Sequence, residues 1–563
     1  MAVRKRAEFS VIVILVLSLG LVACGDTPTS VPTQPPANTT ANPTSTTIVA
    51  ATPTIASTTS IATTVPTTTA APTTAATTQP KTLALLTPTP GPTGTAQTNA
   101  AGYVYYLKEG ALWSVRADGT GPRKLADKVY SYLRTSNNEL VFFQQVKSGN
   151  DEVLQLKLLK LAQGASSSET VLDNKTFVLQ AGAGQSGKPA SRFGVDERAV
   201  GKMAVSPDGS LVTYTKTNFT TKPFSGLDDK ELPTELWIAN LSSQNPAPRR
   251  IVANDKDYIS RPLWSLDNNR ISFIRTENFG TGAGFPSAIW SVYKDGTRLV
   301  FLTGPDLGTV NGQNYRASPA FNMQWVGPYA LAFQASYQSG AALWLHDLTQ
   351  NSDFPRPLAL DASYINSKFC QTVKRFIYVK LDPQTFSNTG VFSVDVERAG
   401  TGGAAPTAVA LDATGSTVFD CFGDAVLYLD AQGQIFLQRI KADGSATGNK
   451  IKLGNPVASD KGQVIANFSP DGKFIVITAY EKDRDVPGLY IYRGDGSGVP
   501  LTGAFPPAPA SLHEWYESKV VAFTVGGAGI NSQLVTVDLS LATPAIKIAD
   551  SSKDFINLVS TGN

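Results

Sequence analysis

Short apolar runs separated by turn residues dominate the chain after residue 98. The runs are rich in aromatic and β-branched residues, and Gly, Asp, Asn and Pro stand between them. A helical spacing of apolar positions is missing from almost all of this region. The pattern predicts many short antiparallel strands and an all-β fold.

The runs repeat as a unit of four strands, which we name a, b, c and d. Strand a ends in an aromatic or aliphatic residue before a tight turn, as in AVSPDGS at 204–210 and NFSPDGK at 467–473. Strand b follows at once, and strand c carries an aliphatic-aromatic pair such as Leu489 and Tyr490. An Asp-Gly turn often leads into strand d, as at 116–127. Such a unit predicts one antiparallel sheet per repeat.

The tryptophans fall on only two positions of this repeat. One set lies in strand c and the other ends strand a: Trp113, Trp237, Trp290 and Trp344, and Trp264, Trp325 and Trp515. A large apolar ring at one register of every repeat favours packing between neighbouring repeats over a platform for sugar stacking. We therefore expect these rings in the core.

The repeats resemble those of TolB-type propellers from residue 103 onward. The resemblance implies a single β-propeller of four-stranded antiparallel blades, and it fixes no activity because unrelated functions share this scaffold. Counting the units gives nine, of which the first lacks strand a. We expect the run at 555–560 to supply the missing strand and to fasten the two chain ends together. Because propellers usually have four to eight blades, we predict about eight, with nine as the alternative.

The N-terminal residues have the layout of an export signal. Basic residues at 4–6 precede an apolar run at 9–22, which is too short for a comfortable membrane span. The sequence LVAC ending at Cys24 resembles a bacterial lipobox, which implies a signal peptide at 1–23 and a diacylglycerol on Cys24. The alternative is an ordinary secretory cleavage site with a coincidental cysteine. Acylation would hold the protein at the membrane without spanning it.

A segment of low complexity follows the cysteine. Residues 24–98 are mostly Thr, Pro, Ala and Ser, with Asp26 and Lys81 as their only charged side chains and with no aromatic residue. Such a composition buries too little apolar surface to offset the entropy of ordering. We expect a disordered stalk that spans roughly 50 Å as a coil. Glycosylation of its Thr and Ser residues stays open. The propeller domain then occupies residues 99–563.

Charge argues against nucleic acid as a partner. The formal net charge is +3, and cleavage of the signal would leave about +1. Lys and Arg residues are dispersed, and no basic run with interleaved aromatics appears outside the export signal.

The connections between strands predict a face for recognition. Antiparallel order places the a-to-b and c-to-d connections on one face and the b-to-c and d-to-a connections on the other. The first class is mostly tight turns, with 397–407 as an exception. The second contains long insertions at 174–199, 217–234, 276–287 and 304–316. The candidate binding residues on these insertions are Arg192, Arg198, Phe219, Phe224, Phe279, Phe285, Tyr315 and Arg316. The alternative is that these loops pack on one another and only cap the channel.

Catalytic and metal signatures are missing from the sequence. A prolyl-oligopeptidase-like enzyme needs a Gly-x-Ser-x-Gly elbow and a separate hydrolase domain, and the string around Ser186 lacks the final Gly in register. Of the two histidines, His346 lies in a predicted strand c, and the other is His513. The Asp residues of the SPDG-type turns are typical turn caps and lack the spacing of a calcium loop. We predict no catalytic residue, no metal and no cofactor, although a channel site built from Tyr, Arg or Asp would leave no linear motif.

Cys370 and Cys421 occupy equivalent turn positions in consecutive repeats. Outside the cytoplasm such a pair is often oxidised, provided that the Cα atoms lie within about 7 Å. A disulfide and two small buried thiols are both open from sequence.

These observations favour a lipid-anchored, extracytoplasmic and monomeric propeller. We expect a non-catalytic scaffold that binds an envelope protein or a glycan. The alternative is a carbohydrate-active lyase or hydrolase with its site at the channel mouth.

Overall fold

A computed structural model describes residues 102–558 with gaps. The residues outside it are 1–101, 162–167, 180–202, 221–232, 244–245, 277–286, 305, 311–312, 317–320, 338–339, 350–354, 383, 386, 399–403, 459–463, 483–486, 499–509, 517, 527–531, 541–543, 545 and 559–563. The predicted signal peptide, Cys24 and the predicted stalk at 24–98 therefore lie outside the described residues. The part of the chain that is described contains no helix able to span a membrane.

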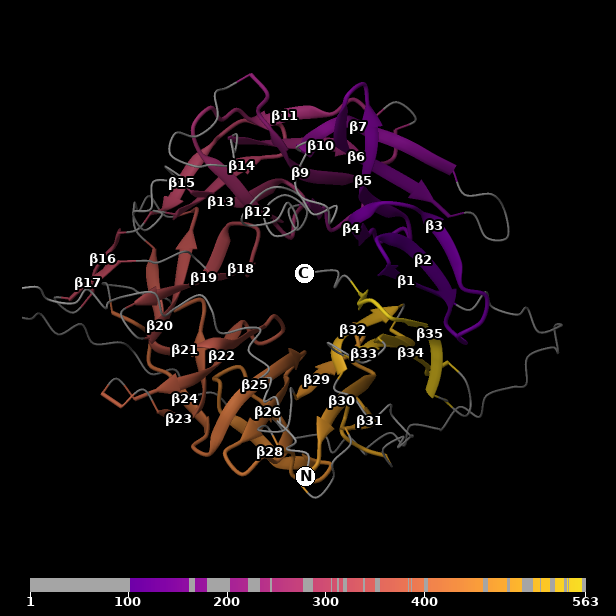
Figure 1. The fold of residues 1–563 in the computed structure, drawn as a ribbon. Coiled ribbons are helices and arrows are strands. Elements are labelled where there is room, and N and C mark those ends of the chain that lie inside the picture. Colours follow the sequence, from indigo (N-terminus) through magenta and orange to yellow (C-terminus); the bar gives the residue numbers. More distant parts are fainter. Residues whose placement is uncertain are drawn as a thin grey trace, which may run out of the picture. The chain divides into compact units, whose positions relative to one another are not determined.

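The described strands form antiparallel sheets in chain order around a ring (Figure 1). Blade 1 contains β36 (Ile556–Asn557), β1 (Tyr103–Lys108), β2 (Ala111–Arg116) and β3 (Arg123–Ala126). Blade 2 contains β4 (Val129–Arg134), β5 (Leu140–Ser148), β6 (Asp151–Lys160) and β7 (Ser168–Leu179). Blade 3 contains β8 (Met203–Val205), β9 (Leu211–Thr217), β10 (Thr234–Asn240) and β11 (Arg249–Val252). Blade 4 contains β12 (Tyr258–Trp264), β13 (Arg270–Thr276), β14 (Ser287–Tyr293) and β15 (Val300–Thr303).

Blades 5 and 6 share one continuous strand. Blade 5 contains β18 (Phe321–Trp325), β19 (Ala330–Tyr337), β20 (Gly340–Asp347) and the first half of β21 (Arg356–Cys370). Blade 6 contains the second half of β21, β22 (Arg375–Leu381), β23 (Asn388–Asp395) and β24 (Val409–Asp412). Ala362, in the middle of β21, pairs with Ala341 on one side and Lys380 on the other. The two blades consequently form a single seven-stranded sheet.

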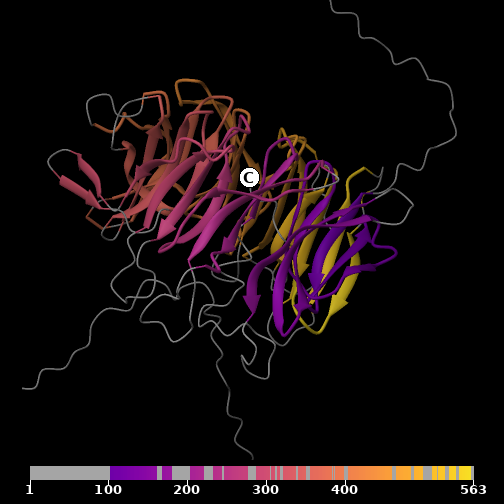
Figure 2. The ribbon, with the colours of Figure 1, turned by 90° about the horizontal axis from the view of Figure 1, so that it is seen from above.

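The remaining sheets complete the ring. Blade 7 contains β25 (Gly415–Phe422), β26 (Ala425–Asp430), β27 (Ile435–Ile440) and β28 (Ala446–Leu453). Blade 8 contains β29 (Ile465–Phe468), β30 (Phe474–Tyr480) and β31 (Pro487–Arg493). Blade 9 contains β32 (Ala510–Tyr516), β33 (Val520–Val525), β34 (Ser532–Asp538) and β35 (Ile546–Ser552). Figure 2 shows the strands of successive blades lying side by side.

The fold is a β-propeller, and its described strands group into nine blades. The predicted all-β fold is confirmed, and the alternative count of nine replaces the expected eight. The expectation of eight came from the usual size of propellers, whereas the literal repeat count was correct. The closing strand is also confirmed, because Asn557 and Ile556 of β36 pair with Leu107 and Lys108 of β1. Blade 1 is thus built from both ends of the described chain.

Two predicted insertions differ from open loops. β7 extends to Leu179, into the predicted insertion at 174–199. The insertion at 304–316 contains a hairpin of β16 (Asp306–Val310) and β17 (Gln313–Arg316). Polar and Gly-containing strands of this kind lack the apolar alternation from which the other strands were predicted.

The hydrophobic core lies between successive blades. For example, one cluster joins Val141 and Phe143 of blade 2 to Val212 and Tyr214 of blade 3. Another joins blades 9, 1 and 2 across the point of closure. Each blade therefore buries its apolar faces against its neighbours, as a closed propeller requires.

Two of the strand a tryptophans bind the preceding blade through a hydrogen bond. Trp264 Nε1 donates to the backbone oxygen of Ala204 at 3.1 Å, and Trp325 Nε1 donates to that of Leu263 at 3.3 Å. Both rings are buried, as is Trp515 in blade 9. These contacts match the predicted packing between repeats.

The Asp-Gly turns lie close against the preceding blade. In the turn of blade 7, Asp443 accepts bonds from the Ser445 amide and hydroxyl, and Gly444 has φ +85°. A Cβ on Gly444 would lie 2.3 Å from Arg375 Nε and 2.3 Å from Ser393 Oγ of blade 6. Glycine is thus required for both the turn and the close approach.

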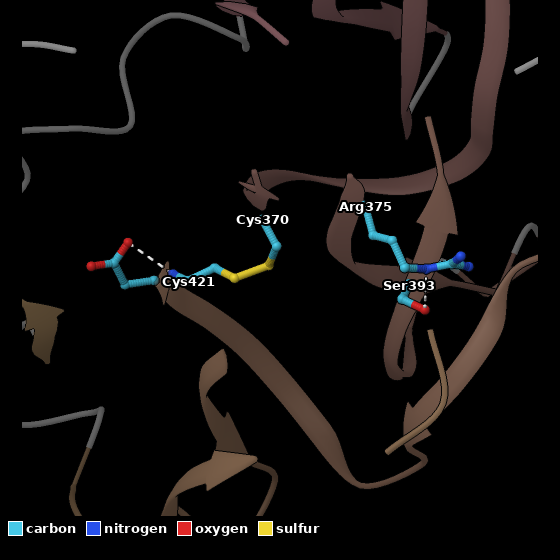
Figure 3. Close-up of a disulfide and its surroundings, with 5 residues drawn as sticks. Cys370, Arg375, Ser393 and Cys421 are labelled. Atoms are coloured by element: carbon cyan, nitrogen blue, oxygen red, sulfur yellow. Dashed lines mark hydrogen bonds between the residues drawn. A yellow bond between two sulfur atoms is a disulfide. The ribbon is translucent and has the colours of Figure 1, made fainter. Parts of the chain in front are cut away.

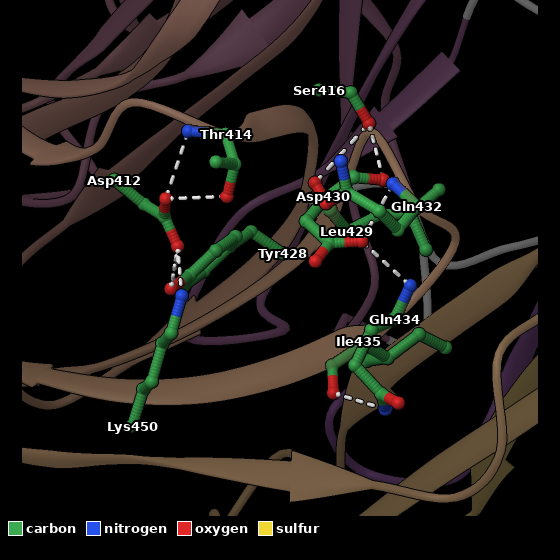
Figure 4. A network of polar contacts seen from close by, with 10 residues as sticks. All are labelled: Asp412, Thr414, Ser416, Tyr428, Leu429, Asp430, Gln432, Gln434, Ile435 and Lys450. Atoms are coloured by element: carbon green, nitrogen blue, oxygen red, sulfur yellow. Dashed lines mark hydrogen bonds and ion pairs between the residues drawn. The ribbon is translucent and has the colours of Figure 1, made fainter.

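Clasps of Asp, Tyr and Lys, buried to different degrees, also join neighbouring blades. In blade 2, Asp173 accepts the Tyr214 hydroxyl at 2.7 Å and Lys216 Nζ at 2.8 Å, both from β9 of blade 3. Lys216 also lies 4.5 Å from the centroid of Trp237, a strand c tryptophan. The same arrangement recurs with Asp550 (Tyr106 and Lys108), Asp361 (Tyr378 and Lys380) and Asp412 (Tyr428 and Lys450), the last shown in Figure 4. Each Asp lies in strand d of one blade, and its Tyr and Lys belong to the next blade.

A buried polar cluster marks the closure of the ring. The Tyr516 hydroxyl of blade 9 accepts a hydrogen bond from the Tyr105 amide at 3.3 Å and donates one to Glu514 Oε2 at 2.7 Å. Tyr132 of blade 2 donates to the Tyr105 carbonyl at 2.6 Å, and the guanidinium of Arg134 lies 4.5 Å from the Tyr516 ring centroid. Three blades therefore meet through one set of hydrogen bonds.

We predict that Glu514→Gln stabilises the protein above pH 7. Burial raises the pKa of Glu514 from 4.5 to about 7, while the Tyr516 hydrogen bond and the Arg134 charge oppose this. The folded state then favours the protonated acid, so stability falls as pH rises from about 4.5 to about 7. Gln keeps the shape without the charge and should gain about 2 kcal/mol at pH 8. Urea unfolding at pH 5 to 8 checks this, and parallel pH profiles for the two proteins would contradict it.

Candidate functional site

A pocket of about 510 Å³ lies between blades 7 and 8. We call it the 7/8 pocket. Its lining comes from the a-to-b turns of both blades, the end of β27 and the end of β31 with the turn that follows: Phe422, Gly423, Asp424, Ala425, Arg439, Phe468, Gly472, Lys473, Phe474, Arg493, Gly494 and Asp495. These connections belong to the tight-turn face, opposite the face on which recognition was predicted.

Tight turns bring the two blades close together at this pocket. In blade 8, Asp471 Oδ1 accepts the Ser469 hydroxyl at 2.8 Å, and Gly472 follows with φ +69°. A Cβ on Gly472 would lie 2.1 Å from the ring of Phe422 in blade 7. A Cβ on Gly494 would lie 1.7 Å from the Gly472 oxygen. Only glycine fits at either position without a shift of the neighbouring group.

The floor of the pocket is aromatic. Phe422 is 40% exposed, and its ring centroid lies 6.0 Å from that of the buried Phe468. One part of the Phe422 ring is held against Gly472, and the exposed part faces outward from the protein. The ring is therefore fixed in place while a large share of its surface is open to a ligand.

Charged side chains surround this floor. Arg439 forms an ion pair with Asp424, and Lys473 Nζ lies 3.0 Å from Asp471 Oδ2. Within the described residues, no carboxylate lies within ion-pair distance of the Arg493 guanidinium. Hydrogen bonds from Ser497, with a smaller effect of the Arg493 charge, lower the pKa of Asp495. Among the described groups of the pocket, the Arg493 guanidinium therefore has no carboxylate partner and can bind an anion.

A disulfide joins blades 6 and 7 beside the pocket (Figure 3). Cys370 at the end of β21 and Cys421 in β25 are bonded, with their Cα atoms 5.5 Å apart. Cys421 directly precedes Phe422 in the chain. At the same interface, Arg375 donates to Ser393 Oγ at 3.3 Å and to the Ala442 carbonyl at 3.2 Å. The backbone that carries the aromatic floor is therefore anchored to the preceding blade.

Five of the eight predicted binding residues lie outside the part of the chain that the structure describes. These are Arg192, Arg198, Phe224, Phe279 and Phe285. Tyr315 and Arg316 belong to β17, in the hairpin that follows blade 4.

Phe219 is the predicted binding residue whose side chain is described. It is 37% exposed in the b-to-c connection of blade 3. Lys175 Nζ of blade 2 lies 4.8 Å from the Phe219 ring centroid. This residue therefore contacts a neighbouring blade and keeps an exposed surface.

The other residues considered for catalysis or metal binding make contacts that belong to the fold. His346 lies in β20, and burial lowers the pKa of its imidazole. The carboxylates of Asp208, Asp267 and Asp471 all accept hydrogen bonds from the serine of their own turn. Ser186 lies outside the described residues, and His513 belongs to β32.

The 7/8 pocket was missed in the sequence because its parts are far apart there. Phe422 and Arg493 come from different blades, and neither stands in a recognisable motif. The usable signal is a departure from the repeat: Cys421 and Phe422 replace the Ser-Pro of the SPDG-type turn. A large aromatic residue in place of proline at a turn marks an exposed ring.

No protein-family model matches the chain, and no characterised protein matches it in sequence. Solved structures with a similar fold include dipeptidyl peptidase 4 of Porphyromonas gingivalis, with 10% identity and a TM-score of 0.45 over 76% of this chain and 63% of that chain. The β-propeller domain of the Trilobed protease from Pyrococcus furiosus has 11% identity and a TM-score of 0.37 over 76% and 99%. TolB from Acinetobacter baumannii has 14% identity and a TM-score of 0.26 over 73% and 81%. These similarities are distant, so the strand order of this chain itself defines the fold.

Proposed function

We propose that the protein is a lipid-anchored, extracytoplasmic recognition scaffold built on a TolB-like propeller. The 7/8 pocket is the observation that carries this proposal, because it combines an exposed aromatic ring with a guanidinium that has no carboxylate partner among the described residues. Aromatic and Arg side chains are the residues most enriched at binding hot spots. Among the described residues that line the pocket there is no Ser, Cys or His. The lining thus favours binding over nucleophilic catalysis.

Two features support the location outside the cytoplasm. LVAC at 21–24 resembles a lipobox, and a basic and apolar segment precedes it. The disulfide between Cys370 and Cys421 suits an oxidising compartment, because cytoplasmic thiols are kept reduced. In this proposal the acylated Cys24 holds the chain at the membrane and the Thr-rich segment sets the propeller away from it.

The partner class follows from the same features. The nearly neutral net charge after cleavage argues against a polyanion such as nucleic acid. A monomeric propeller with a fixed, mixed polar and aromatic pocket suits a protein or a glycan of the cell envelope.

We predict that Cys24→Ala abolishes lipid attachment. Thioether acylation needs the Cys24 sulfur, so incorporation of radiolabelled palmitate should fall at least about tenfold in growing cells. Cys421→Ser is the matched control, because it removes a cysteine of the propeller and should keep the label. Equal labelling of the wild type and Cys24→Ala would contradict the anchor.

A further inference from the structure

We propose that the 7/8 pocket binds an acidic saccharide, with one sugar ring over Phe422 and the sugar carboxylate beside Arg493. This inference rests on the proposed function, because it names the ligand class of the scaffold.

The Phe422 ring offers the surface that a pyranose needs. Its face carries negative charge density, which attracts the weakly positive C–H groups of a sugar face. Gly472 and Phe468 hold the ring, and the disulfide at Cys421 fixes the backbone beside it. Because the ring is already ordered, little conformational entropy is lost when a ligand covers it.

The Arg493 guanidinium selects for a carboxylate. Arg439 already forms an ion pair with Asp424, and Lys473 forms one with Asp471. Arg493 has no carboxylate partner in the described part of the chain. A planar guanidinium binds a carboxylate through two parallel hydrogen bonds. A ligand with one such group would therefore complete the charge balance of the pocket.

The pair of Asp424 and Arg439 suits sugar hydroxyls. Both side chains are partly exposed, at 39% and 49%. The carboxylate accepts hydrogen bonds and the guanidinium donates them, so neighbouring hydroxyls of one sugar can contact both. Their ion pair holds the two groups in a fixed relation before the ligand arrives.

The shape of the pocket favours a saccharide over an extended peptide. Its lining consists mainly of turn residues and strand ends, so it does not offer the row of free backbone groups at a strand edge that an extended peptide pairs with. A volume of about 510 Å³ lies within the range of small-ligand sites and suits one or two sugar rings.

Calorimetric titration of the full-length chain in detergent tests the proposal. The probe is a disaccharide of glucuronic acid and N-acetylglucosamine, and the neutral comparison is N,N′-diacetylchitobiose. We expect the acidic sugar to bind at least about tenfold more tightly than the neutral one. Arg493→Gln and Phe422→Ala should each weaken binding of the acidic sugar about tenfold or more.

Lys441→Gln is the matched control, because Lys441 is an exposed cation on the same face and does not line the pocket. It should leave the affinity unchanged within about twofold. Arg493 is exposed, so its replacement keeps the test valid even if Phe422→Ala unfolds the protein. Three results would overturn the proposal: no binding of the acidic disaccharide, equal losses for Arg493→Gln and Lys441→Gln, or tighter binding of an extended acidic peptide.

Failure of the saccharide and failure of the scaffold give different results. If palmitate labelling at Cys24 is retained and the acidic sugar does not bind, only the ligand class is wrong. If the sugar binds and palmitate labelling is absent, the lipid anchor of the proposed function is wrong.

Discussion

Asp173→Ala is expected to destabilise the propeller by about 3–5 kcal/mol, because it removes the acceptor of a buried clasp. The Asp173 side chain is 5% exposed and that of Lys216 is 17% exposed, while Tyr214 is fully buried. Without Asp173, the Lys216 charge and the Tyr214 hydroxyl both stay between blades 2 and 3 without their partner. Urea unfolding of the variant and the wild type at pH 7 measures the difference.

The control for this variant is an exposed turn. Asp118 accepts hydrogen bonds from Thr120 of its own turn, so Asp118→Ala should cost less than about 1 kcal/mol. A double variant, Asp173→Leu with Lys216→Met, removes both charges and should recover most of the lost stability. A loss below about 1 kcal/mol for Asp173→Ala would show that the clasp does not stabilise the contact between these blades.

Loss of the disulfide is expected to lower the free energy of unfolding by about 4 kcal/mol in the chain-entropy account. The bond closes a loop between cysteines that are 51 residues apart, which restricts the unfolded chain. Cys370→Ser with Cys421→Ser removes this restriction and keeps side chains of similar size. The measurement is urea unfolding of the double variant beside the oxidised wild type.

Thiol labelling provides the direct check on this bond. In the unfolded and unreduced wild type, a maleimide should label neither Cys370 nor Cys421, and peptide mass spectrometry identifies each site. After reduction, both should be labelled. Full labelling of both sites before reduction would contradict the disulfide and remove one support for the location outside the cytoplasm.

Local patterns predicted the framework of the fold. Trp264 and Trp325 lie where the repeat placed them, because a large apolar ring at one register needs a neighbouring blade. Gly444 and its turn also follow from local sequence, since an Asp-Gly pair favours a tight turn whatever surrounds it.

The polar contacts between blades could not be predicted from these patterns. Asp173 and Tyr214 belong to different sheets, and nothing local to either residue indicates the other. The usable signal is the recurrence of Tyr-x-Lys in strand b, at Tyr106 and Lys108, Tyr214 and Lys216, and Tyr378 and Lys380. A cation spaced two residues from a buried tyrosine points to the same side of the strand and indicates a shared acidic partner.

The site was less predictable than the fold. The long loops predicted a binding site on the face that carries the b-to-c and d-to-a connections. The 7/8 pocket lies on the opposite face, which carries the tight turns. The pocket owes its aromatic surface to Phe422 and its guanidinium to Arg493, and the closed propeller brings these two residues together from neighbouring blades. Long loops indicate where changes in length are tolerated. A pocket such as this one depends instead on which short turns of neighbouring blades lie against each other.

Photo-crosslinking in living cells tests the central claim that the 7/8 pocket is the recognition site of an anchored propeller. A photoreactive phenylalanine analogue at position 422 is compared with the same analogue at position 441 on the same face. The account predicts a discrete, periodate-sensitive envelope adduct at position 422 that is lost with Arg493→Gln and never forms at position 441. The same adducts at both positions, or an adduct at 422 that Arg493→Gln leaves unchanged, would contradict it.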